Sequence, residues 1–243
     1  MIHIELHKLR TVRAPLILLA ASQLIVAAGV SGLVLGGADL RDPQNVAKAL
    51  AHAGLVSLFT LVLGIMAVAG EYRNKTITDV YLSEPRRGRV IRAKLAAYGI
   101  AGAVFGVCNA VTAMAALSIW WTAKGVPLHL SDPAIWRTIV GCFAANVAFA
   151  VIGVGVGALV RNVTAAVVIA LAWLALIEGV VGQLIGDLAR WLPFASGSAL
   201  EDIKIQGSSV TPLPQLGAGF VLTGYAALFA LVAVSTTVRR DVS

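Results

Sequence analysis

The sequence is poor in charge and in chemical motifs. Only 13% of its 243 residues are charged, and its two cysteines, Cys108 and Cys142, both lie inside long apolar runs. It contains no CxxC, HExxH or GxSxG motif and no pair of catalytic carboxylates, so nothing indicates a metal centre or a hydrolase. A GxxxxGKS/T loop is also missing, so any ATP that drives this protein must be bound by another chain. We therefore expect a protein that is not itself an enzyme and binds no cofactor.

Apolar residues are abundant by contrast. They make up 58% of the chain, more than a soluble protein of this size can bury. They form six long runs, and about 20 helical residues suffice to cross the ~30 Å hydrocarbon layer. The runs are apolar on every face, whereas the strands of a membrane β-barrel alternate between apolar and polar residues. We predict an all-α integral membrane protein with one transmembrane domain over residues 1–243, with spans at about 15–37, 53–70, 95–121, 134–160, 163–182 and 216–238.

Basic residues are distributed unevenly between the two sides that six spans create. Thirteen of the 19 Lys and Arg residues lie in the terminal segments and in the loops after the second and fourth spans. Short cytoplasmic loops attract Lys and Arg, so both termini are predicted to be cytoplasmic. Trp120, Trp121, Trp136 and Trp191 at the predicted outer ends agree with this orientation. The net charge of +7 follows from the same rule and indicates no nucleic-acid partner.

The first fourteen residues are basic and precede the first span. Leu6, Leu9 and Val12 fall about one helical turn apart, while Lys8 and Arg10 are available to lipid phosphates. This pattern predicts an interfacial helix over residues 1–14. A cleaved signal peptide is excluded because the apolar run is too long and five more spans follow.

The loop between the second and third spans, residues 71–94, is the most informative segment. Ile77, Val80, Tyr81 and Glu84 recur at helical spacing, which predicts a short helix from about Asn74 to Ser83 with one apolar stripe. Pro85 should end this helix, and a basic turn should follow at Arg86, Arg87, Gly88 and Arg89. The segment is either a loop whose charges hold it in the cytoplasm or a docking helix for a soluble partner.

The order of residues in this loop resembles that in the membrane subunits of type-2 ABC exporters, the ABC-2 family. The chain departs from the family at Lys75, where glycine is common, and in its denser basic cluster after Pro85. Six spans with both ends inside extend the resemblance over the whole chain. The residues that carry it are Glu71, Thr76-Ile77, Leu82, Pro85, the pair Arg86-Arg87, and Ala93-Lys94-Leu95 at the head of the third span.

The resemblance implies that residues 71–94 form a cytoplasmic coupling loop whose short helix, Asn74 to Glu84, docks on a separate ATP-binding subunit. It also implies two ATPase subunits, which bind ATP and Mg, and a second six-span subunit that is either another copy or a related chain. The expected coupling interface comprises Glu71, Asn74, Lys75, Thr76, Ile77, Val80, Tyr81, Glu84, Pro85, Arg86 and Arg87.

Within the spans, polar residues are few. Asn109, Asn146, Glu178 and Gln183 are candidates for a substrate pathway. The alternative for the two asparagines is hydrogen bonding between helices, and for Glu178 a hydrated position near the outer interface. Residues 186–215 are predicted to form an outer loop with short helical pieces.

The expected function is therefore that of the membrane subunit of a bacterial ATP-driven exporter in the cytoplasmic membrane. Its apolar pathway favours a hydrophobic or amphiphilic substrate, such as a drug, a peptide antibiotic or a lipid-like compound. The alternatives are a secondary transporter and a membrane anchor of a cytoplasmic complex. A secondary transporter is expected to have inverted repeats, ionisable pairs at mid-membrane or broken helices in matching halves, for which the sequence gives no clear sign.

Overall fold

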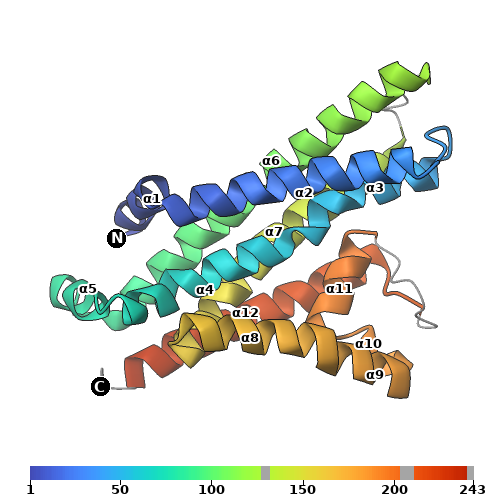
Figure 1. Ribbon diagram of the computed structural model, residues 1–243. Helices are drawn as coiled ribbons and strands as arrows, with labels where there is room; N and C mark the ends of the chain where they lie inside the picture. Colours follow the sequence, from blue (N-terminus) through green and yellow to red (C-terminus); the bar gives the residue numbers. More distant parts are fainter. Residues whose placement is uncertain (127–131, 203–210, 240–243) are drawn as a thin grey trace.

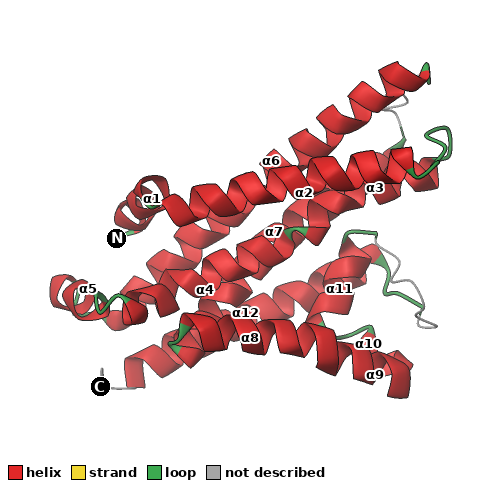
Figure 2. Cartoon of the chain, in the orientation of Figure 1, coloured by secondary structure: helices red, strands yellow, loops and turns green. Residues whose placement is uncertain are grey.

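The computed structural model describes residues 1–126, 132–202 and 211–239, and all secondary structure in these ranges is helical, as Figure 2 shows. Six segments are long and apolar enough to cross a membrane, which confirms the predicted number of spans. The chain is thus a multi-pass helical membrane protein. The six segments are Arg13–Leu35, Pro43–Arg73, Arg87–Lys124, Pro133–Val160, Val163–Leu184 and Gln215–Thr237.

Several spans are built from more than one helix (Figure 1). The elements in chain order are α1 (Ile2–Thr11), α2 (Arg13–Leu35), α3 (Pro43–Leu55), α4 (Ser57–Arg73), α5 (Ile77–Ser83), α6 (Arg87–Lys124), α7 (Pro133–Val160), α8 (Val163–Ala172), the π-helix η1 (Trp173–Glu178), α9 (Gly179–Leu184), α10 (Gly186–Ala189), α11 (Pro193–Leu200) and α12 (Gln215–Arg239).

Helix α7 lies at the centre of the bundle and packs against α4, α6 and α12. Its contact with α4 depends on small residues, because a side chain at Gly64 would collide with the carbonyl oxygen of Ala150. Gly153 lies equally close to the carbonyl oxygen of Leu61. Close backbone approach of this kind is how helices associate in lipid, where no hydrophobic force draws them together.

The N-terminus, helix α5 and the end of α12 lie at the same end of the bundle (Figure 1). This arrangement is what an even number of spans requires. It also brings the basic loop of residues 71–94 close to α1.

The second span begins ten residues earlier than predicted, at Pro43 instead of residue 53. Asp42 caps the helix by accepting a hydrogen bond from the Gln44 amide, and proline is favoured at the first helical position. The polar residues Gln44 and Lys48 obscure this start in the sequence. Val56 then separates α3 from α4, so the span is broken near its middle.

The third span also begins early, because α6 starts at Arg87. The predicted basic turn is therefore wrong for Arg87, Gly88 and Arg89, which are helical. The predicted coupling helix is shorter than expected, since α5 runs from Ile77 to Ser83 instead of from Asn74.

Lys75 explains the late start of α5. Its φ of 57° is left-handed, so Asn74, Lys75 and Thr76 form a turn after α4 instead of a helix. A left-handed conformation costs a non-glycine residue about 1–2 kcal/mol. This is the position at which the exporters that the loop resembles often carry glycine.

The segment after the fifth span contains short helices, as predicted, in its described part. The predicted range 186–215 includes residues 203–210, which lie outside the described residues. Helix α11 is not a surface piece, because its residues from Ser196 to Leu200 are buried and it packs against α12 and α7. Gln215 fixes its end by donating a hydrogen bond of 2.8 Å to the carbonyl oxygen of Leu200.

Candidate functional site

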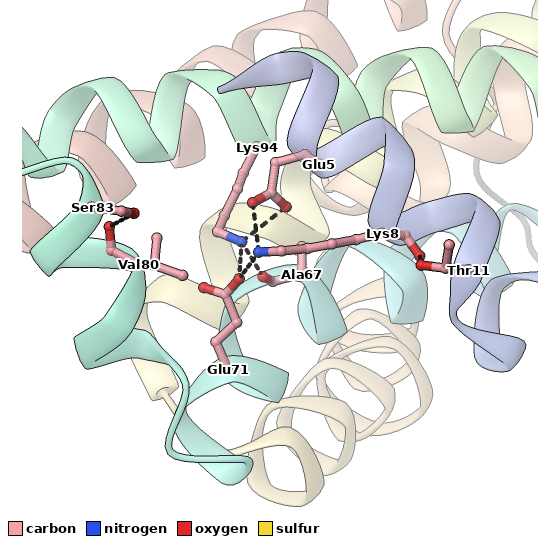
Figure 3. Close-up of polar contacts among 8 residues, drawn as sticks. All are labelled: Glu5, Lys8, Thr11, Ala67, Glu71, Val80, Ser83 and Lys94. Atoms are coloured by element: carbon pink, nitrogen blue, oxygen red, sulfur yellow. Dashed lines mark hydrogen bonds and ion pairs between the residues drawn. The ribbon is translucent and has the colours of Figure 1, made fainter.

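Four charged side chains meet where α1, α4 and α6 come together, at the end of the bundle that carries α5 (Figure 3). They are Glu5 and Lys8 from α1, Glu71 from the last turn of α4, and Lys94 from α6. Both lysines lie within 3.0 Å of both glutamates. We refer to these four residues as the charge cluster.

Lys94 is the centre of the charge cluster. Its side chain is fully buried, and its ammonium group donates to Glu71 Oε1 at 2.7 Å, Glu5 Oε2 at 3.0 Å and the Ala67 carbonyl oxygen at 2.9 Å. An ammonium group has three donors, so all of its hydrogen-bonding capacity is used. Lys94 thereby joins the start of the third span to the end of the second span and to α1.

Lys8 closes the cluster from its exposed side. Its ammonium donates to Glu71 Oε1 at 2.7 Å and to Glu5 Oε1 at 3.0 Å, and its side chain is 36% exposed. Burial alone would lower the pKa of Lys8, but hydrogen bonds and charges from Glu71 and Glu5 outweigh this and raise it above its ordinary value. Lys8 therefore stabilises the fold at and below neutral pH, and this stabilisation is lost only as the pH rises through its raised pKa.

The charge cluster is electrically balanced, with two carboxylates and two ammonium groups. Buried charges are tolerated when they are paired and hydrogen-bonded, and removing one partner typically costs 3–5 kcal/mol. One atom is left over, since Glu71 Oε2 is buried without a hydrogen-bond partner in the described part of the chain.

Three further contacts hold the segment around α5 against the bundle. The guanidinium of Arg87 lies 5.3 Å from the ring centre of Tyr81, and that of Arg161 lies 5.1 Å from the ring centre of Tyr72. Arg89 forms an ion pair of 2.9 Å with Glu84, and this hydrogen bond lowers the pKa of Glu84. Burial raises the pKa of Tyr81, which lies close to Tyr72. Helix α5 is therefore fastened to its own chain on one face.

The opposite face of α5 is open. Ile77 is 4% exposed, whereas Leu82 is 77% exposed, and Thr78 and Asp79 are exposed beside it. The apolar stripe that defined this helix in the sequence thus packs on the bundle, and Leu82 lies off that stripe. Leu82 follows Ile77 by five residues, a spacing that places the two side chains on different faces of a helix. This spacing was the signal in the sequence for the outward position of Leu82.

The structure distributes the expected coupling residues over three environments. Glu71 and Ile77 are buried and cannot touch another protein directly. Intermediate exposure is found for Val80, Tyr81, Glu84 and Arg87, and full exposure for Asn74, Lys75, Thr76, Pro85 and Arg86. The predicted interface residues did not include Glu5, Lys8 or Lys94, nor Thr78, Asp79 or Leu82, although the last three lie within the predicted coupling helix.

The two asparagines of the spans hydrogen-bond between helices. Asn109 Oδ1 accepts from Gln23 Nε2 at 2.7 Å and from Ser22 Oγ at 3.0 Å, joining α6 to α2. Asn146 Nδ2 donates to the Ala53 carbonyl oxygen at 3.2 Å, joining α7 to α3.

The other two pathway candidates lie elsewhere. Gln183 is exposed on α9, and Glu178 lines a cavity between α4, α7, η1 and α12. The four candidates therefore do not converge on one site.

The described residues contain no group of three or more His, Cys, Asp or Glu side chains that could hold a metal ion. Comparisons with protein-family models and with curated proteins find no match to this chain.

Proposed function

We propose that this chain is the membrane subunit of an ATP-driven exporter of the ABC-2 type, and that α5 is the helix through which a separate ATPase subunit drives it. The observation that carries the proposal is the geometry of α5, with one face fastened to the bundle and the other exposing Leu82. In this proposal the partner covers Leu82, and the exposed Thr78 and Asp79 beside it form the polar rim of the contact.

The charge cluster is the element that transmits motion in this proposal. Displacement of α5 acts on the end of α4 and the start of α6, because α5 lies between them in the chain. Lys94 fastens these two helices to each other and to α1 through Glu71 and Glu5. The three helices then move as one body, and ATP binding shifts the transporter between states only if the α5 contact differs between those states.

The remaining parts of the proposal follow the resemblance. ATP and Mg bind to the partner ATPase, and a second six-span subunit completes the pathway. The chain lies in a bacterial cytoplasmic membrane with α1 at the inner interface and both termini in the cytoplasm. The cargo is a hydrophobic or amphiphilic compound.

The experiment compares two leucines of similar exposure at opposite ends of the bundle. Leu82→Ala is expected to weaken retention of an ATP-hydrolysing subunit by about tenfold or more, since burial of a leucine is worth about 1.5–3 kcal/mol. Leu184→Ala is the control, because Leu184 is 76% exposed on α9, far from α5. The readouts are the ATPase subunit retained on the purified chain in mild detergent and its rate of ATP hydrolysis.

The variant Glu71→Gln distinguishes docking of the ATPase subunit on α5 from transmission of its motion through the charge cluster. This variant keeps the exposed face of α5, so the ATPase subunit is expected to remain bound while ATP hydrolysis no longer drives transport. Equal retention by the Leu82 and Leu184 variants would contradict docking through α5, and unchanged transport in the Glu71 variant would contradict transmission through the charge cluster.

A secondary transporter is a second candidate, and one observation favours it. The second span is broken at Val56, and the buried carboxyl group of Glu201 lies against Gly54 beside this break. Broken helices with ionisable groups are typical of ion-coupled transporters. Transport by the purified chain alone, driven by a pH gradient across vesicles without ATP, would favour this candidate over the exporter.

A further inference from the structure

A cavity of about 330 Å³ lies inside the membrane-spanning part of the chain, between α4, α7, α8, η1, α11 and α12. Its size falls in the range of small-molecule sites and exceeds the ~150 Å³ cavity that holds a benzene molecule. Most of its lining is aliphatic. Five aromatic side chains also contribute, namely Phe149, Trp173, Phe194, Tyr225 and Phe229.

The cavity is accessible from the bilayer. Ile169 on α8, Trp173 on η1 and Leu228 on α12 all line it, and they are 53%, 40% and 54% exposed on the outer surface of the spans. In a membrane the part of this surface that the proposed second subunit leaves uncovered faces lipid. A compound dissolved in the bilayer can therefore reach the cavity laterally, without passing through water.

One charged side chain, Glu178, belongs to the lining among the described residues. Glu178 Oε1 accepts hydrogen bonds from Trp173 Nε1 at 3.2 Å and from the Phe194 amide at 3.0 Å, and Oε2 accepts from the Ala195 amide at 3.0 Å. These three N–H donors favour the ionised form of the carboxyl group, whereas burial disfavours it. The cavity thus combines an apolar body with one negative charge.

Glu178 also closes the cavity. The amides of Phe194 and Ala195 belong to the first turn of α11, and Pro193 and Phe194 form part of the cavity wall. The carboxylate therefore binds α11 to η1. A π-helix within a span is uncommon and frequently marks a functional position, and here it carries this carboxylate.

We propose that this cavity binds a hydrophobic organic cation that enters from the bilayer. The aliphatic and aromatic walls accommodate the hydrocarbon body, aromatic faces attract a cation, and the Glu178 carboxylate favours positive over negative charge. The inference rests on the proposed export function, for which the cavity is the site that receives the cargo. Release of α11 from Glu178 would then open the site on the other side.

The test uses two probes of nearly the same shape and opposite charge, tetraphenylphosphonium and tetraphenylborate. Their binding to the purified full-length chain in mild detergent is measured by equilibrium dialysis. Ala170 lines the cavity, and Ala170→Phe is expected to weaken binding of both probes about tenfold or more by filling it. The matched control is Ala172→Phe, two residues further along α8 and outside the cavity lining.

Charge selectivity is tested separately with Glu178→Gln. The ratio of the two dissociation constants is expected to shift toward the anion by about tenfold, because the variant removes the one negative charge of the lining. This ratio does not depend on the fraction of folded protein, so partial unfolding of the variant does not obscure it.

Two results would overturn the inference. One is unchanged binding in Ala170→Phe, and the other is an unchanged ratio in Glu178→Gln. Retention of a phospholipid that is lost in Ala170→Phe, without binding of either probe, would also overturn it by making the cavity a lipid site. Binding requires neither ATP nor an ATPase, so its failure would leave docking through α5 untouched, and failure of docking would leave the binding result standing.

Discussion

At the scale of single residues, Lys94 is the least replaceable side chain of the charge cluster. It is fully buried and bonded to groups on α1 and α4, whereas Lys8 reaches the same carboxylates from a side chain that is 36% exposed. Water can replace part of what Lys8 provides. Lys94 is fully enclosed by protein, so its loss leaves two carboxylates with Lys8 as the remaining ammonium group of the charge cluster.

Lys94→Met is therefore expected to destabilise the chain by about 3–5 kcal/mol, the usual cost of an uncompensated buried charge. For a chain of this length that corresponds to a melting temperature lower by about 10 °C. The measurement is thermal unfolding in detergent followed by circular dichroism. Lys8→Met is the matched control, and a smaller shift is expected for it.

The double variant Glu71→Gln with Lys94→Met checks the mechanism. If the two residues act as a pair, the double variant loses less stability than the sum of the single variants. Additive losses, or an equal effect of Lys8→Met and Lys94→Met, would contradict the central role of Lys94.

At the scale of elements, α11 is held at both ends by glutamates. Glu178 binds its first turn, and Glu201 follows its last residue and is buried against Gly54. Burial raises the pKa of Glu201 to about 8, although a hydrogen bond with Ser57 lowers it in part.

This geometry makes the packing of α11 sensitive to pH. Below about pH 4.5, the ordinary pKa, Glu201 is protonated whether α11 is packed or released. Between about 4.5 and 8 only the released form loses its proton, so packing weakens as the pH rises and the loss is complete above about 8. A thiol introduced as Ser198→Cys on α11, with Cys108 and Cys142 replaced by serine, is expected to react faster with a maleimide at pH 9 than at pH 6.

Glu201→Gln serves as the control, because glutamine does not titrate. In this variant, reactivity should rise with pH only by the amount that ionisation of the thiol itself causes. A persistent additional rise in the Glu201→Gln protein would assign the pH dependence to another group.

The elements that the sequence predicted well are those defined by local pattern. Each span contains a long apolar run, and the number of spans follows from counting such runs. The early start of α3 and α6 was missed because a polar or basic residue at the end of a membrane helix looks like a loop residue. Arg87, Gly88 and Arg89 illustrate this. A glycine between arginines indicates a turn in the sequence, whereas in the structure all three residues are helical.

At the scale of the whole molecule, the basic residues and the common end of the termini define an orientation. Six spans require the N-terminus and the end of α12 to lie on one side, together with α5. The excess of Lys and Arg on that side predicts that it faces the cytoplasm.

Reporter fusions measure this orientation. Green fluorescent protein fused to the C-terminus is expected to fluoresce, and alkaline phosphatase fused there is expected to be inactive. Fusions after Gly125, where α6 ends, should give the opposite pair of results. Active phosphatase at the C-terminus would reverse the orientation and exclude α5 from contact with a cytoplasmic ATPase.

The charge cluster could not be predicted from the sequence, although its loop could. Glu71 was singled out by the resemblance to the exporter family, but its partners come from distant parts of the chain. Lys94 and Glu5 are separated by 89 residues, and no local periodicity relates them. A single acid within the basic first helix was the available signal for Glu5, and it indicates a partner without identifying one.

That separation has a consequence for how the protein is made. Glu5 leaves the ribosome with Lys8 as its neighbour, and Lys94 follows about 4–18 s later at ordinary rates of synthesis. During this interval α1 has no complete docking site, since both Glu71 and Lys94 are still to be delivered by the second and third spans. Docking of α1 thus requires that synthesis has reached the start of the third span, so the N-terminal helix is fixed only after the first two spans have been made.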